Sequence, residues 1–187
     1  MKQAILAATL STMFLSGCMS DLTKSDSAPS PSASSQSYSD SVSVAQTVPF
    51  SSDASIRDAI RSDCDLGNKL SGFVADFGDS NSIRVSRVGN PKGQSGKVLV
   101  LEITDATGGG GGAWSGMKSV SVKGQLMQNG RQIGSFKAKR SSGGGAFGGY
   151  KGTCSILGRC VKALGKDIAV WGGGCDTQHV LPNGTPE

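Results

Sequence analysis

Four strand-like runs separated by short connections are the feature that most constrains this chain. Ile83 and Val85 alternate in the first run, and residues 98–103 form an apolar run typical of a central strand. Runs at 116–127 and 131–140 follow and form a predicted hairpin. Because the connections are too short for parallel crossovers, the sequence predicts an antiparallel four-stranded sheet.

The register of this hairpin depends on the loop at residues 128–130, Gln-Asn-Gly. A two-residue turn would set Val122 opposite Lys137 and split the apolar faces. A three-residue loop, with Gly130 in the left-handed conformation and a bulge, sets Val122 opposite Phe136. We therefore expect the three-residue loop.

Helical periodicity brackets the strands. A capping-box-like start at Ser55 and Asp58 predicts a short helix, followed by a longer one with an apolar stripe of Leu66, Leu70, Phe73, Val74 and Phe77. A final helix has a stripe of Leu157, Val161, Leu164, Ile168 and Trp171. Gly158 and Gly165 would let this helix approach the sheet closely. The predicted fold is α+β, with N-terminal helices and a C-terminal helix packed on one face of the sheet.

The first 17 residues have the features of a signal peptide. Lys2 precedes an apolar run, residues 4–15, that is too short to span a bilayer, and small residues follow it. The sequence Leu-Ser-Gly-Cys at 15–18 resembles the bacterial lipobox, which implies that the mature protein begins at an acylated Cys18 and is anchored to a membrane. The alternative is a secretory peptide cut near Gly17, with Cys18 an ordinary thiol.

Met19, and not Asp, follows Cys18. By resemblance to sorted lipoproteins, this implies the outer membrane of a Gram-negative cell, with the protein on the periplasmic side. Residues 18–50 are rich in serine and poor in aliphatic residues before Val42, which predicts a disordered tether after the lipidated cysteine. Residues 51–175 suffice for one α+β domain, and we expect 176–187 to be a flexible tail.

The chain carries 19 lysines and arginines against 14 acidic residues, a net charge of +5 that is spread along the sequence. Outside the cytoplasm, anionic partners are phospholipid or lipopolysaccharide headgroups and peptidoglycan carboxylates, and not nucleic acid. A spread charge of this size is typical of a soluble surface.

The glycine-rich stretch contains a G-x-G-x-x-G at Gly143, Gly145 and Gly148. A dinucleotide site needs a parallel βαβ unit and an acidic residue at the end of the next strand, and this sequence predicts neither. A P-loop-like run at 89–97 has Pro91 where its first glycine should stand. We read that run as a hairpin loop and expect no cofactor.

Catalytic groups are scarce. The single histidine, His179, lies in the terminal segment, and the acidic pairs Asp63 with Asp65 and Asp76 with Asp79 fall at helix ends, where acids usually cap or are solvated. We therefore expect that the protein is not an enzyme.

Two glycine runs flank the predicted hairpin at its open end, and both carry aromatic residues. They could present these rings, with nearby cations, to a peptide, glycan or lipid headgroup. The candidate binding residues are Trp114, Lys118, Arg140, Phe147, Tyr150 and Lys151. The alternative is that Trp114 and Phe147 cap the core while the glycines merely allow the turns.

Four further cysteines, Cys64, Cys154, Cys160 and Cys175, favour disulfides over a metal site in an oxidising compartment. Cys154 and Cys160 would lie about 9 Å apart along a helix, too far to bridge. Cys64 would then pair with one and Cys175 with the other. A Cys154–Cys160 bridge becomes possible if the helix starts late.

The lipobox, the Cys-Asp-Leu helix start at 64–66, GGAWSGMKSVSVKG and SGGGAFGGYKGTCSILGRCVKALGKDIAVW together resemble a family of small uncharacterised Gram-negative lipoproteins with an α/β domain. The resemblance implies a location and a fold but no activity. Two functional classes follow. One is a non-catalytic binding or envelope-organising module acting on an envelope protein, peptidoglycan or lipid. The other is an inhibitor of an envelope hydrolase, or a hydrolase itself.

Overall fold

The computed structural model describes residues 40–108, 117–143 and 152–173. The strands are β1 (Asp40–Ala45), β2 (Ile83–Val88), β3 (Lys97–Thr107), β4 (Lys118–Gln128) and β5 (Arg131–Ser142). The helices are α1 (Asp58–Asp63), α2 (Leu66–Ser80) and α3 (Thr153–Gly173), and a 3-10 turn, η1 (Pro91–Gly93), precedes β3.

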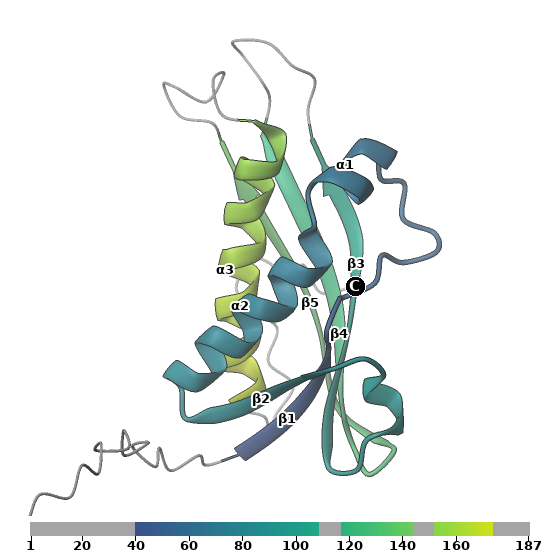
Figure 1. Ribbon diagram of the computed structural model, residues 1–187, viewed down its shortest axis with the longest axis vertical. Coiled ribbons are helices and arrows are strands. Elements are labelled where there is room, and N and C mark those ends of the chain that lie inside the picture. The colour runs from purple at the N-terminus through teal and green to yellow at the C-terminus, as the bar shows by residue number, and fades with distance from the viewer. Residues whose placement is uncertain (1–39, 109–116, 144–151, 174–187) are drawn as a thin grey trace, which may run out of the picture. The chain divides into compact units, whose positions relative to one another are not determined.

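The strands form one mixed sheet of five strands in the order β2-β1-β3-β4-β5 (Figure 1). β3, β4 and β5 are antiparallel, whereas β1 is parallel to both of its neighbours. The α+β class is confirmed. The prediction of four antiparallel strands is wrong, because the sheet has a fifth strand and β2 runs in the same direction as β3.

The additional strand, β1, lies within the segment 18–50 that we predicted to be a disordered tether. Val42 and Val44 alternate with serines, and both valines are buried in the core. The period-two pattern therefore outweighs the low overall apolar content of the segment. The part of the predicted tether before Asp40 lies outside the described residues.

The connection from β2 to β3 is a crossover and not the predicted hairpin loop. It crosses over β1, which pairs Val42 with both Val85 and Lys97. β2 ends at Val88, opposite Ala45, and β3 begins at Lys97, opposite Val42. Between these points the chain moves back by three residues, about 10 Å along the strands, and sideways by two strand spacings of about 4.8 Å. The loop around η1 spans this, so a long crossover is unnecessary.

The hairpin between β4 and β5 has a two-residue turn, which corrects the predicted three-residue loop. Asn129 and Gly130 both have positive φ, 50° and 79°, as in a type I′ turn. The left-handed conformation predicted for Gly130 is confirmed. A bulge at Ile133 then shifts the register, so that Val122 lies opposite Ala138 and the apolar faces stay aligned.

The two long helices, α2 and α3, lie side by side on one face of the sheet, as predicted (Figure 1). α2 covers β2, and α3 covers β4 and β5. The predicted stripes form much of the core, and the fully buried large side chains include Leu66, Leu70, Val74, Leu157, Leu164 and Ile168.

The glycines of α3 differ in their surroundings. A Cβ on Gly165 would lie 2.5 Å from Phe73 Cβ and 3.1 Å from the Phe73 carbonyl carbon, whereas a Cβ on Gly158 would meet no atom within 4 Å. Gly165 therefore allows α3 to approach α2, and not the sheet as we had expected. The start of α1 also differs from the prediction, since Arg57 is its N-cap and Ser55 does not cap it.

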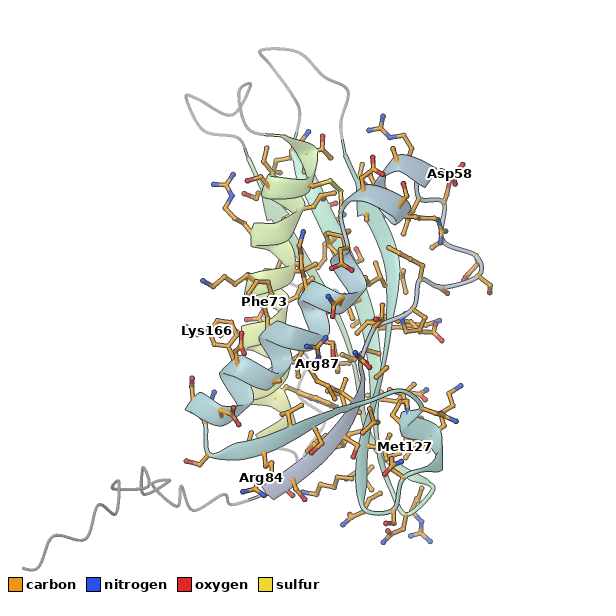
Figure 2. The ribbon with its side chains drawn as sticks, viewed as in Figure 1. Asp58, Phe73, Arg84, Arg87, Met127 and Lys166 are labelled. Atoms are coloured by element: carbon orange, nitrogen blue, oxygen red, sulfur yellow. A yellow bond between two sulfur atoms is a disulfide. The ribbon has the colours of Figure 1, made fainter. Side chains whose placement is uncertain are left out.

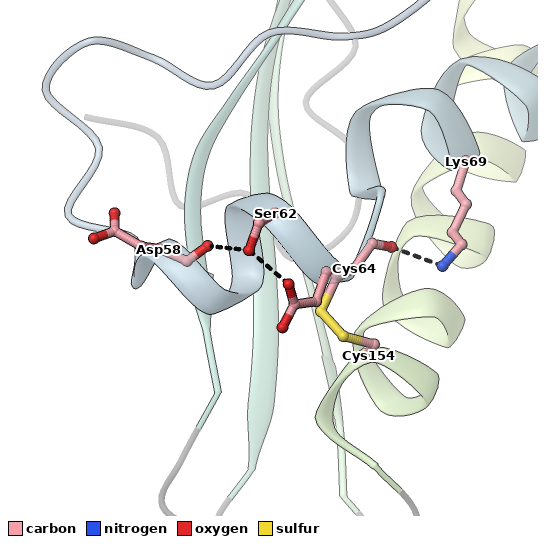
Figure 3. The surroundings of a disulfide bond; sticks show 6 residues. Asp58, Ser62, Cys64, Lys69 and Cys154 are labelled. Carbon is pink, nitrogen blue, oxygen red and sulfur yellow. Dashed lines mark hydrogen bonds between the residues drawn. A yellow bond between two sulfur atoms is a disulfide. The ribbon is translucent and has the colours of Figure 1, made fainter.

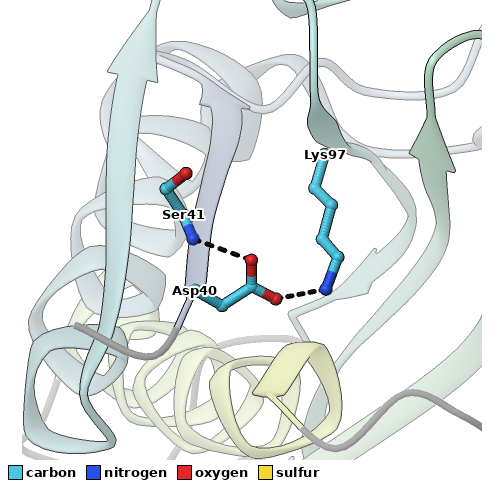
Figure 4. A network of polar contacts seen from close by, with 3 residues as sticks. All are labelled: Asp40, Ser41 and Lys97. Atoms are coloured by element: carbon cyan, nitrogen blue, oxygen red, sulfur yellow. Dashed lines mark hydrogen bonds and ion pairs between the residues drawn. The ribbon is translucent and has the colours of Figure 1, made fainter.

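Different strands and helices begin and finish at the two ends of the domain. We call the end at which β1 begins the proximal end and the opposite one the distal end. β1 begins at the proximal end, where Asp40 forms an ion pair with Lys97 and accepts a hydrogen bond from its neighbour's amide, Ser41 N, at 2.8 Å (Figure 4). α3 finishes at this end, because a Cβ on Gly173 would lie 2.4 Å from Ile83 Cδ1. β3 and β5 finish at the opposite, distal end, where β4 and α3 begin.

Candidate functional site: the distal end of the domain

Four elements meet at the distal end: β3 ends at Thr107, β4 begins at Lys118, β5 ends at Ser142 and α3 begins at Thr153. The sheet register joins three of them, since Thr107 pairs with Ser119 and Lys118 pairs with Ser142. The two predicted glycine-aromatic segments therefore leave and rejoin the domain at one place. Residues 109–116 and 144–151 themselves lie outside the described residues.

Gly108 fixes the point at which the first of these segments leaves β3. Its carbonyl accepts a hydrogen bond from the Arg57 guanidinium. A Cβ at this position would lie 2.7 Å from Thr153 Cγ2 and 3.1 Å from Ile60 Cδ1. A larger residue here would force the side chains of Thr153 and Ile60 to move, so glycine favours the close approach of β3 to the start of α3 and to α1.

A disulfide between Cys64 and Cys154 joins the connection between α1 and α2 to the first turn of α3 (Figure 3). It closes a loop with a sequence separation of 90 residues. Lys69 Nζ donates a hydrogen bond to the Cys64 carbonyl at 2.7 Å, and Ser62 Oγ donates one to the Asp58 carbonyl at 3.0 Å. The bridge and these bonds hold the helical side of the distal end in place.

Cys160 is a buried free thiol whose Sγ donates to the Lys118 carbonyl at 3.7 Å. Burial raises the pKa of this thiol. Cys160 has no disulfide partner within the described residues, and Cys175, which we considered as its partner, lies outside them.

The two candidate cations that the structure describes are not open binding groups. Lys118 is buried, with 2% of its surface exposed. Arg140 forms a two-pronged ion pair with Asp167, at 2.6 and 2.8 Å, which raises the pKa of the guanidinium. Their place beside the glycine-aromatic segments suggested that they bind a ligand, but Lys118 is buried in the domain and Arg140 joins β5 to α3. Trp114, Phe147, Tyr150 and Lys151 lie outside the described residues, as does Cys18.

One residue at the distal end was missed in the sequence analysis. Met117, directly before β4, is 69% exposed, which is the highest fraction among the exposed large hydrophobic residues of the described part of the chain. It adds an adaptable apolar side chain beside the first glycine-aromatic segment. Met117 stands in the sequence between that segment and the first, buried residue of β4, and this position could have indicated an exposed side chain at the distal end.

The acidic residues considered for catalysis either form hydrogen bonds with neighbours in the sequence or are exposed to solvent. Asp63 Oδ1 lies 2.6 Å from Ser62 Oγ, whose one proton is shared between this carboxylate and the Asp58 carbonyl, and Asp65 accepts a hydrogen bond from Asn68 at 2.9 Å. Asp76 and Asp79 are exposed at the end of α2. His179 lies outside the described residues.

Within residues 40–108, 117–143 and 152–173, no three His, Cys, Asp or Glu side chains gather as a metal would require. The helices in those ranges are also too short or too polar to cross a bilayer. For the G-x-G-x-x-G, Gly143 follows β5, which pairs antiparallel with β4, and not the parallel strand of a dinucleotide site.

No protein-family model matches the chain, and neither does any curated protein. Among solved structures, it is similar to XCC0632 from Xanthomonas campestris, of the family model DUF330, with 13% identity and a TM-score of 0.47 over 71% of this chain and 83% of that one. It is also similar to lipoprotein GNA1162 from Neisseria meningitidis, with 17% identity and a TM-score of 0.41 over 70% of this chain and 98% of that one.

A third similar structure is the PelC dodecamer from Paraburkholderia phytofirmans, with 11% identity and a TM-score of 0.40 over 69% of this chain and 87% of that one. With identities and TM-scores this low, the three likenesses carry no argument about what this chain does.

Proposed function

We propose that this protein is a lipid-anchored, non-catalytic binding module of the bacterial envelope, tethered through Cys18 to the outer membrane and facing the periplasm. Its binding site is the distal end of the domain, with the two glycine-aromatic segments as the contact surface. The partner is an envelope protein, peptidoglycan or a lipid headgroup.

The observation that carries this proposal is the separation of the two ends. The chain that follows Cys18 enters the domain at Asp40, at the proximal end, while both glycine-aromatic segments attach at the distal end. β3 has 11 residues, which at about 3.3 Å per residue separates the ends by about 35 Å. A domain tethered at one end is thus able to present the other to a partner away from the lipid.

The rigidity of the attachment points also supports a binding role. The Cys64–Cys154 bridge, the Arg57–Gly108 hydrogen bond and the Cys160–Lys118 contact hold the ends of the two segments together. Binding loops are commonly carried in this way on a rigid scaffold, because a fixed framework lowers the entropy lost on association.

Photo-crosslinking in cells tests the site, with a photoreactive amino acid at Ser115 or at Ala146 in the full-length protein. The matched control is the same substitution at Lys92, an exposed residue of η1 near the proximal end. We expect a discrete adduct from both distal positions and none from Lys92. An adduct from Lys92 alone, or equal adducts from all three positions, contradicts the proposed site.

The anchor needs a separate test. Metabolic labelling with a radioactive fatty acid should mark the wild-type protein and not a Cys18→Ser variant, and membrane fractionation should recover the label in the outer membrane. Equal labelling of the two proteins contradicts the lipid anchor. The crosslinking experiment tests the binding site independently of this result.

A further inference from the structure

The outer edge of β5 is open in the part of the chain that the structure describes. β5 ends the sheet and pairs only with β4. It has 12 residues, against 6 in β2 at the opposite edge. An edge strand of this length offers a row of main-chain donors and acceptors to another extended chain.

β5 is also strongly basic. It carries Arg131, Lys137, Lys139 and Arg140 and no acidic residue. Burial alternates from Ser135 to Ala138, so that Lys137 and Lys139 are exposed on the sheet face that α2 and α3 leave open. Their side chains stand two residues apart, which is the repeat of an extended strand.

The charges across the sheet continue in rows that end at this edge. Glu102, Lys123 and Lys137 form one cross-strand row, and Lys123 Nζ lies 2.9 Å from Glu102. Asp105, Ser121 and Lys139 form the next row. In each row the acidic residue is on β3 and the outermost residue, on β5, is a lysine. An acidic residue on an adjoining strand would continue each row with an opposite charge.

α3, which packs on β5 and β4, also has an excess of basic residues. It carries Arg159, Lys162 and Lys166, all exposed, and its one acidic residue, Asp167, is engaged by Arg140. Lys162 lies over the Phe73 ring, toward α2. Lys166 lies on the outer side of α3 (Figure 2). The basic residues of α3 thus add to the positive charge of the domain, while the side chain of α3 that meets β5 is Asp167, which Arg140 neutralises.

We propose that the outer edge of β5 binds an extended, acidic segment of a partner protein, which joins the sheet as an additional strand. Main-chain hydrogen bonds to β5 provide much of the affinity. Specificity comes from acidic residues at alternate positions of the segment, which face Lys137 and Lys139. This site runs along the side of the sheet and reaches the distal end at Ser142, and it does not depend on the lipid anchor.

The same lysines disfavour a second copy of this chain as the occupant. Two β5 strands paired edge to edge would bring two sets of basic side chains together without a compensating acid. The edge of β2 is a weaker candidate, because its 6 residues offer half as many main-chain groups as the 12 residues of β5. An anionic membrane would bring charge but would leave the main-chain groups of β5 without partners.

The test measures binding of a fluorescent peptide, Thr-Glu-Val-Glu-Val-Glu-Thr with blocked ends, to the full-length protein in detergent by fluorescence anisotropy. A second peptide of the same sequence is N-methylated at alternate residues, which keeps the charge and removes the hydrogen bonds along one edge. We expect the N-methylated peptide to bind about tenfold or more weakly, because several main-chain bonds are lost. Equal binding of the two peptides, or no binding of either, overturns strand addition.

The protein variant Lys137→Glu/Lys139→Glu should weaken binding of the unmethylated peptide by about tenfold or more through charge reversal at two facing positions. The matched control, Arg84→Glu/Lys92→Glu, makes the same change in net charge away from β5 and should bind like the wild type. Thermal melts check that both variants fold. Equal loss in both variants means that net charge alone attracts the peptide, and it overturns the proposal.

Two further outcomes identify other occupants. Stronger binding to vesicles containing anionic phospholipid than to the peptide, with the same dependence on Lys137 and Lys139, overturns the proposal in favour of a membrane. A dimer in sedimentation that is lost in the Lys137→Glu/Lys139→Glu variant overturns it in favour of a second copy.

Discussion

Cys160 shows how one buried side chain can report on the whole domain. It is 2% exposed, and its thiol contacts the carbonyl at the start of β4. Because burial disfavours the thiolate, the pKa of this thiol is raised in the folded protein. The unfolded chain therefore releases this proton at a lower pH than the folded one.

This difference predicts both slow alkylation and a pH dependence of stability. N-ethylmaleimide at pH 8 should modify Cys160 far more slowly in the native protein than in denaturant, as followed by peptide mass spectrometry. The free energy of unfolding should fall as the pH rises above about 8.5, by up to about 1.4 kcal/mol per pH unit for this proton. Below that pH the thiol is protonated in both states and contributes no slope.

Cys160→Ala is the control, because it removes the titrating group. The variant should lose this part of the slope in urea titrations between pH 8 and 10, whatever its effect on stability at pH 7. Native alkylation at the denatured rate, or an unchanged slope in Cys160→Ala, would contradict this account of the thiol.

At the residue scale, the sequence predicts which reactions a side chain can undergo better than it predicts which residues surround that side chain in the fold. The cysteines were correctly expected to form a disulfide, and Cys64–Cys154 was among the open pairings. Lys118 and Arg140 were wrongly taken as available cations. Burial of Lys118 and the ion pair of Arg140 with Asp167 are tertiary contacts between β4 or β5 and α3, and no local pattern encodes them.

At the scale of elements, the two glycines of α3 form a matched pair for a packing experiment. Gly165→Ala places a methyl group against the backbone of Phe73, which cannot move cheaply, and should destabilise the protein by about 1–3 kcal/mol. Gly158→Ala meets open space and should stabilise it by about 0.5–1 kcal/mol through a lower entropy loss in the helix. Urea unfolding measures both.

The opposite signs make the experiment decisive, because both variants add the same group to the same helix. Equal stabilisation by the two changes would mean that α2 and α3 do not approach closely at Gly165. Equal destabilisation would mean that Gly158 has a neighbour, or a need for glycine, that the structure does not place there.

The elements themselves were largely predictable, and the errors concern how they connect. Periodicity gave the core stripes of α2 and α3, and the apolar run at 98–103 correctly indicated a central strand. The hairpin was misjudged because its bulge lies at Ile133 in β5 and not in the turn. A bulge anywhere in the strand restores the alignment of apolar faces, so the alignment does not locate it.

At the scale of the whole molecule, β1 decides where the folded domain begins. A protein that starts at Ser51, the boundary predicted from composition, lacks Val42, Val44 and Val48, which are all buried. At about 1.5–3 kcal/mol for each buried side chain, their removal approaches the total stability of a typical domain, about 5–15 kcal/mol. We expect this truncated protein to lack a cooperative thermal transition by circular dichroism.

The comparison is a protein that starts at Gln36 and keeps β1 intact. It should melt cooperatively, at a temperature close to that of the full-length chain. A Ser51 protein that melts at the same temperature would mean that β1 is dispensable, and that the three-strand unit of β3, β4 and β5 with its helices forms the stable domain.

The interior position of β1 also determines how the domain resists mechanical force. Tension between the chain before Asp40 and a partner held at the distal end acts nearly parallel to the strands. β1 is paired on both sides, with β2 and β3, so such a pull loads two rows of hydrogen bonds in shear and strains them together. An edge strand pulled sideways would instead peel away one bond at a time. The first strand therefore joins the domain to the chain before it through a connection that withstands pulling.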